Sequence, residues 1–105
     1  MAAVRQNFVD YFTPRKNQVF ERYQFWRLQQ QQGEGIDAFV TSLRLRARSC
    51  EFAELTDSLI RDKVVLSCPD ARLQERLLRE SDLTLTKAID LCHAAEATQQ
   101  QLRAI

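Results

Sequence analysis

Apolar side chains recur at helical spacing along most of the chain, and the clearest run lies between residues 36 and 50. Because successive residues of a helix are turned by about 100°, the apolar positions of this run fall within about 100° of arc. They are Ile36, Phe39, Val40, Leu43, Ala47 and Cys50. The pattern predicts a helix over residues 36–50 whose apolar side faces a core.

The preceding helix is predicted over residues 14–31. A hydroxyl able to cap, Thr13, stands before Pro14, and proline is tolerated at the first helical position. The apolar residues of this helix occupy two sides, which predicts two neighbours. Val19, Tyr23 and Trp26 share one side with Phe20 at its edge, and Phe25 and Leu28 lie on the far side.

Both glycines of the chain stand between these two helices, in the segment Gly33-Glu34-Gly35. Glycine tolerates a positive φ angle, which suits the end of a helix and a sharp change of direction. A tight reversal is therefore predicted at residues 33–35.

A third helix, predicted over residues 55–67, carries apolar residues on opposite sides. Leu55, Leu59 and Leu66 share one side, while Ile60 and Val64 lie roughly 140–180° away from Leu55. One side can face the core and the other a second copy of the chain. Ile60, Arg61, Val64 and Val65 are the candidate interface on this interpretation. The alternative is a central helix covered on both sides by its own chain.

Two further helices complete the expected fold. Asp70 is a suitable cap for a short helix that carries Leu73, Leu77 and Leu78, and a hydroxyl in the loop 81–84 suits the start of a last helix over residues 85–103. The sequence thus predicts an all-α fold, a compact bundle of five principal helices, with a further short helical arm possible before Pro14.

Length and composition limit the classes of protein to which the chain can belong. Its 105 residues are 45% hydrophobic and 28% charged, which is typical of one domain. The sequence contains neither a signal-peptide core nor a bilayer-spanning apolar run, so we expect an intracellular, cytoplasmic protein without a membrane partner, the nucleus remaining an alternative. Cys50, Cys68 and Cys92 lack metal-ligand spacing, and we expect buried free thiols with no metal or cofactor.

Residues suited to catalysis are scarce. The chain has one histidine, His93, and neither a GxSxG nor a GxxxxGK[ST] motif, so we do not expect an enzyme. The acidic residues Glu75 and Glu80 stand three or four positions from arginines and are expected to pair with them. These arginines are Arg72, Arg76 and Arg79.

The overall charge of +1 conceals an uneven distribution. Through Arg48 there are eight basic and four acidic residues, a net charge of +4, and the remainder carries seven basic and ten acidic residues, a net charge of −3. Such asymmetry suits nucleic-acid binding, or contact between one end of a molecule and the other end of its neighbour, or simply a solvated helical surface. The candidate basic surface comprises Arg15, Lys16, Arg22, Arg27 and Arg44.

Six residues around the glycine turn form a spaced motif of a glutamine, a glutamate and four apolar or aromatic positions. They are Gln30, Glu34, Ile36, Phe39, Val40 and Leu43. Their spacing resembles the major homology region of retroviral and retrotransposon Gag capsid proteins. Segments 11–17, 21–25, 50–52, 59–65 and 82–89 extend the likeness to the Gag capsid of gypsy-class LTR retrotransposons over most of the chain.

The resemblance implies the C-terminal capsid lobe for residues 13–105, with residues 1–12 as an N-terminal arm or the end of the interlobe linker. A retroviral capsid C-terminal-domain-like fold would then dimerise and contribute to a capsid shell. The implied partners are a second copy and the higher lattice, the N-terminal lobe, the nucleocapsid segment and, through full-length Gag, RNA. In retroviral relatives the pairing helix follows the homology-region helix, which points to residues 55–67.

Gln30 and Glu34 also have a direct physical interpretation. They stand at a joint between two helices, where backbone groups at the helix ends lack partners, and long side chains that fold back can satisfy these groups. Ile36, Phe39 and Leu43 would then hold the joint to the core. The resemblance fits both an active element and a host protein of the Arc type derived from Gag. For such a host protein, a groove that binds a partner's peptide is a further alternative.

Overall fold

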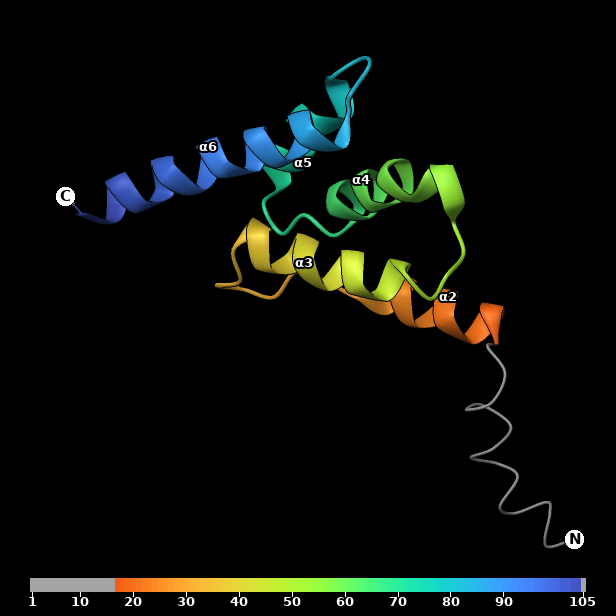
Figure 1. Cartoon of the computed structure of the whole chain (residues 1–105). Coiled ribbons are helices and arrows are strands. Elements are labelled where there is room, and N and C mark those ends of the chain that lie inside the picture. Colours follow the sequence, from red (N-terminus) through yellow and green to blue (C-terminus); the bar gives the residue numbers. More distant parts are fainter. Residues whose placement is uncertain (1–16, 105) are drawn as a thin grey trace, which may run out of the picture.

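Five α-helices follow one another in a computed structural model that describes residues 17–104 (Figure 1). They are α2 (Gln18–Arg27), α3 (Ile36–Ala47), α4 (Thr56–Leu66), α5 (Ala71–Arg79) and α6 (Leu85–Ala104), and a 3-10 turn, η1 (Ala53–Leu55), leads into α4. No strand occurs within residues 17–104. The expected all-α bundle of five principal helices is confirmed, and the possible arm before Pro14 lies outside the described residues.

The core gathers around α3 and α4. Helix α4 packs against α3, α5 and α6, and α3 also packs against α2 and α6. All six apolar residues expected on the inner side of the helix at 36–50 are buried, although the helix itself ends at Ala47 and Cys50 lies in the turn beyond it. The buried apolar residues are Phe25, Ile36, Phe39, Val40, Leu43, Ala47, Cys50, Phe52, Ile60, Val64, Val65, Leu77, Leu85, Ala88 and Cys92.

Helix α2 is shorter than the expected helix over residues 14–31. It begins at Gln18 because Asn17 is extended and its side-chain oxygen accepts a hydrogen bond of 3.0 Å from the Phe20 N–H. It ends at Arg27 because Leu28 leaves the helical conformation and packs against the core. The capping position expected at Thr13 lies outside the described residues.

Only one side of α2 is covered by the described chain. Phe25 is buried, whereas Val19 and Tyr23 on the other side are 78% and 56% exposed. The ring of Trp26 lies 6.5 Å from that of Phe52 and is partly shielded by it. The second neighbour expected for this helix is therefore not provided by residues 17–104.

Local capping sets most of the other helix ends. Gly33 has a φ of +87°, as the expected reversal requires, and Gly35 precedes α3 in an extended conformation. The Asp70 carboxylate accepts hydrogen bonds from the N–H groups of Arg72 and Leu73 at the start of α5. Thr84 Oγ1 accepts from the Lys87 N–H at the start of α6. The expected caps at Asp70 and in the loop 81–84 are thus confirmed.

None of the described helices is both long and apolar enough to cross a membrane.

Candidate functional site

The turn between α2 and α3 is closed by the two polar residues of the homology-region motif. Gln30 Nε2 donates to the Glu34 carbonyl at 2.9 Å, and the Gln31 N–H donates to Glu34 Oε1 at 2.9 Å. The Glu34 N–H in turn donates to the Gln31 carbonyl at 3.0 Å. Long side chains therefore fold back onto backbone groups at this joint, as expected from the sequence.

The joint is attached to the core by the apolar part of the motif. Ile36, Phe39 and Leu43 are almost fully buried, and Val40 is buried beside them. Their burial fixes the direction in which α3 leaves the turn. The six motif residues thus lie together, and Gln30 and Glu34 each contribute one side-chain hydrogen bond to the turn.

A residue far along the sequence completes the joint. Glu96 on α6 accepts a hydrogen bond through Oε2 from the Ile36 N–H, at 2.8 Å, and so occupies the N-terminal end of α3. His93 Nε2 lies 2.8 Å from Asp37 Oδ1 and makes a second polar link between α6 and α3. Sequence reasoning missed both contacts, because Glu96 and His93 stand nearly sixty residues from their partners and no local pattern marks them.

The candidate interface on α4 is corrected by the structure. Ile60 and Val64 are completely buried and Val65 is nearly so, because α4 turns this side toward the helices around it. Arg61 donates from Nη1 to the Leu83 carbonyl at 2.9 Å and pairs with Asp62 at 2.9 Å. These four residues hold the bundle together and do not form an exposed face.

The opposite side of the same helix is open. Leu55 and Leu66 are 58% and 67% exposed, and Leu59 between them is only partly buried. We call Leu55, Leu59 and Leu66 the outer face of α4. The sequence pattern placed these three leucines on one side of the helix, but the expected interface was on the opposite side, so the exposed and buried sides are the reverse of that expectation.

Lys63 borders the outer face, three or four residues from Leu59 and Leu66. Its side chain is 5% exposed and forms no ion pair within residues 17–104. Burial disfavours the charged ammonium and lowers the pKa of Lys63.

The candidate basic surface is not gathered into one patch. Arg22 donates to the carbonyls of Cys50 and Glu51 at 2.9 and 3.2 Å, and its guanidinium lies 5.0 Å from the centre of the Phe52 ring. Arg44 pairs with Asp57 at 3.5 Å, and Arg27 stacks 5.5 Å above Tyr23. Arg15 and Lys16 lie outside the described residues.

The ion pairs expected along α5 are also absent from the described chain. Glu80 pairs with Lys87 at 2.9 Å, and this hydrogen bond, followed by the positive charge of Lys87, lowers the pKa of the Glu80 carboxyl. Arg76 makes a smaller contribution in the same direction. The expectation that Glu75 and Glu80 neutralise the arginines of α5 is therefore wrong, because the start of α6 supplies a nearer cation to Glu80.

A groove of about 550 Å³ lies between the turn after α2, the loop joining α4 to α5, and the C-terminal half of α6. Three carboxylates and five glutamines line it, with no lysine or arginine among the lining residues. The lining comprises Gln30, Gln31, Gln32, Gly33, Glu34, Gly35, Cys68, Pro69, Asp70, Leu73, Cys92, Ala95, Glu96, Gln99 and Gln100. We call this feature the acidic groove.

All three cysteines are free thiols, as expected. Cys50 and Cys92 are buried and Cys68 is half-buried. Burial, with smaller contributions from Cys68 and Glu96, raises the pKa of Cys92 to about 12, so this thiol is protonated at neutral pH. The described residues contain no group of three or more side chains that could hold a metal ion.

The chain matches no protein-family model, no curated protein and no solved structure.

Proposed function

We propose that this domain is the self-association module of a retrotransposon-type Gag capsid, and that two copies pair through the outer face of α4. The observation that carries this function is the exposure of Leu55 and Leu66 on one side of the helix that follows the homology-region motif. The opposite side of α4 is already buried by its own chain, so the outer face is what remains for a partner.

Isologous pairing suits the dimensions of this face. Leu55 ends the 3-10 turn η1 and Leu66 ends α4, eleven positions later, with Leu59 between them. Around a twofold axis the same leucines of both copies are buried in one interface. Full burial of one leucine side chain contributes about 1.5–3 kcal/mol, and association must first offset the loss of translational and rotational freedom. We therefore expect weak pairing, with monomers at low concentration.

The geometry of the joint supports the same function. Gln30 and Glu34 satisfy backbone groups at the turn, and Ile36, Phe39 and Leu43 fix α3 beneath it. This arrangement sets the position of α3, against which α4 packs. A rigid connection from the motif to α4 is what an assembly domain needs if its pairing surface is to keep one orientation.

Sedimentation equilibrium over a wide concentration range tests the function. The double variant Leu55→Asp/Leu66→Asp places two charges on the outer face, and we expect at least a tenfold weaker association with an unchanged thermal melting curve. Leu45→Asp is the matched control, because Leu45 is 58% exposed on α3, as Leu55 is before α4. Association that is equally strong in the double variant, or equally weakened in the control, would contradict pairing through this face.

Val64→Asp is not a suitable test of pairing. Val64 is fully buried, and a carboxylate there would lose its hydration without gaining a partner. We expect this variant to unfold, so a loss of association would report on the core and not on the interface.

A further inference from the structure

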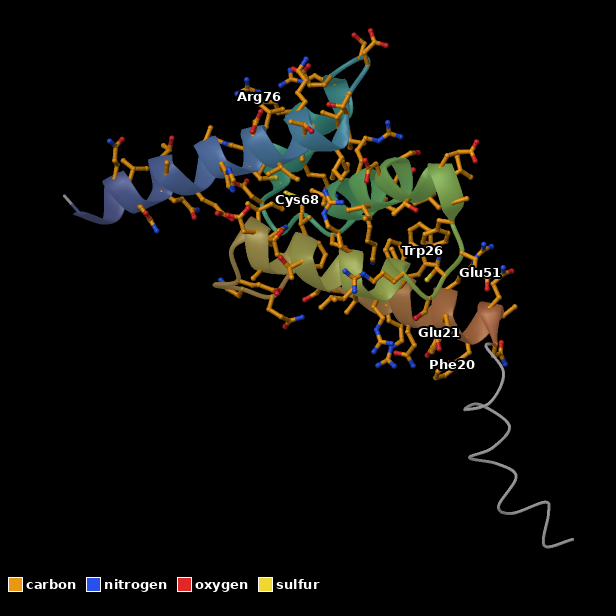
Figure 2. All side chains as sticks on the ribbon, in the orientation of Figure 1. Phe20, Glu21, Trp26, Glu51, Cys68 and Arg76 are labelled. Carbon is orange, nitrogen blue, oxygen red and sulfur yellow. The ribbon has the colours of Figure 1, made fainter. Side chains whose placement is uncertain are left out.

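The three arginines of α5 form a stripe on the surface of the bundle. Arg72, Arg76 and Arg79 fall within about 60° of arc on the helix, and all three are exposed. None forms an ion pair within the described chain. Figure 2 shows Arg76 pointing away from the rest of the bundle. We call these residues the arginine stripe.

The acidic groove presents the opposite charge in a fixed arrangement. Glu34 Oε1 is held by the Gln31 N–H, Glu96 Oε2 by the Ile36 N–H, and Asp70 Oδ1 by the Arg72 N–H. Within residues 17–104 no hydrogen bond reaches the second oxygen of any of these carboxylates. The backbone therefore orients three anionic groups whose remaining acceptor sites have no cation nearby in the lining.

We propose that the arginine stripe of one copy docks in the acidic groove of a second copy. The two surfaces are complementary in charge, and neither forms an ion pair within the described residues. In its own molecule the stripe does not enter the groove, because none of its three arginines is among the lining residues. The occupant is therefore a neighbouring molecule.

This contact joins different surfaces of the two molecules and so differs from pairing through α4. An isologous contact stops at two copies, whereas a head-to-tail contact leaves a free stripe at one end and a free groove at the other. Only the combination of the two contacts rests on the proposed function. Together they would extend association beyond a dimer into a lattice. The head-to-tail contact itself is separately measurable.

The two contacts respond differently to salt. Guanidinium groups bind carboxylates in a bidentate geometry, but exposed pairs are individually weak and are screened as ionic strength rises. Head-to-tail association should therefore weaken at least tenfold between roughly 50 mM and 500 mM salt, where the Debye length shortens from above 10 Å to below 8 Å. Leucine contacts on α4 carry no such dependence.

Charge exchange between the two surfaces gives a direct test. The first variant, Arg72→Glu/Arg76→Glu/Arg79→Glu, reverses the stripe. The second, Gln32→Arg/Glu34→Gln/Gln99→Arg/Gln100→Arg, replaces one carboxylate by an amide and places three cations in the groove at side chains that make no hydrogen bond within the described chain, so that the charge of the lining changes from −3 to +1. Both are made in the Leu55→Asp/Leu66→Asp background, and weight-average mass is measured by light scattering at low salt.

Each variant alone should lose head-to-tail association, because like charges then face one another. An equimolar mixture should regain it, since the reversed stripe of one variant fits the basic groove of the other and the native surfaces still match. Arg48→Glu, at an exposed arginine beyond α3, is the control and should associate like the parent. Thermal melting of every variant establishes that it is folded.

Several results would overturn the proposal. A mixture that associates no better than its separate components would show that the two surfaces do not meet. The reversed-stripe variant could also associate undiminished but lose binding to a fluorescein-labelled single-stranded RNA. That result would mean that the arginine stripe binds phosphodiesters and not a second copy. The proposal of pairing through α4 is tested independently. Salt-insensitive association that survives Leu55→Asp/Leu66→Asp would contradict that pairing and would leave the head-to-tail contact untouched.

Discussion

Helices α2 and α3 are consecutive and of similar length, yet they use their apolar residues in opposite ways. Of the ten residues of α2 only Phe25 is buried, and the side formed by Val19 and Tyr23 faces outward. In α3 every apolar residue on the predicted inner side is buried, and Leu45 alone of its large apolar residues is exposed. The apolar residues of α2 occupy two sides whereas those of α3 share one, so periodicity alone does not decide which side of α2 is buried.

The difference lies in the number of neighbours. Helix α3 is surrounded by α2, α4 and α6, whereas α2 packs mainly on α3. The orientation of α2 is then set by a few specific contacts at the end of α3. Arg22 binds the carbonyls of Cys50 and Glu51, and the rings of Phe25 and Phe52 meet edge to face at 5.1 Å. These polar and aromatic contacts favour the orientation in which Phe25 faces inward.

Truncating the inward-facing ring of α2 should have the largest effect. Phe25→Ala removes a fully buried side chain and leaves a cavity, and we expect a loss of about 3–5 kcal/mol in the free energy of unfolding. Tyr23→Ala on the outward side should cost less than about 1 kcal/mol. Urea denaturation followed by circular dichroism measures both. Equal losses would mean that the two sides of α2 are equally buried.

Removing the guanidinium that orients α2 should have an intermediate effect. Arg22→Met keeps much of the side-chain volume but leaves the Cys50 and Glu51 carbonyls without this donor, and we expect a loss of about 1–3 kcal/mol. Arg27→Met is the matched control on the same helix and should change stability by less than about 0.5 kcal/mol. A stable Arg22→Met protein would show that the aromatic contact alone orients the helix.

The joint between the two helices should show the smallest effect. Glu34→Ala removes the acceptor of the Gln31 N–H, and we expect a loss of about 1 kcal/mol, a lower melting temperature and weaker assembly. Glu34→Gln keeps an oxygen at this position but removes the charge, so it should restore the melting temperature while head-to-tail association at low salt stays weakened.

Calorimetry and light scattering on the same samples separate these effects. Gln29→Ala, an exposed position in the same turn, serves as the control. If Glu34→Ala melted and assembled like the parent protein, the joint would have no special role.

Much of the local structure could be predicted because its causes are local. The inner side of α3 follows from apolar residues at intervals of three and four, and all of them are buried. The cap at Asp70 and the contacts of Gln30 and Glu34 join groups within four residues of one another. Such contacts form wherever the surrounding chain places the segment, so their residues can be identified without the fold.

The surfaces of the molecule could not be predicted in the same way. Helix α4 has apolar residues on both sides, and nothing within it distinguishes the buried Ile60 and Val64 from the exposed Leu55 and Leu66. Arg76 stands four positions before Glu80, but the Glu80 carboxylate pairs with Lys87. Glu96 reaches the start of α3 from sixty residues away.

The sequence by itself determined the helices, the turn that separates α2 from α3, and the residues that satisfy the backbone at that turn. Only the tertiary structure decided which sides of α2 and α4 are covered and which charges remain without a partner. The physical reason is that helix formation and capping depend on groups a few residues apart, whereas burial and ion pairing depend on which distant segments pack alongside.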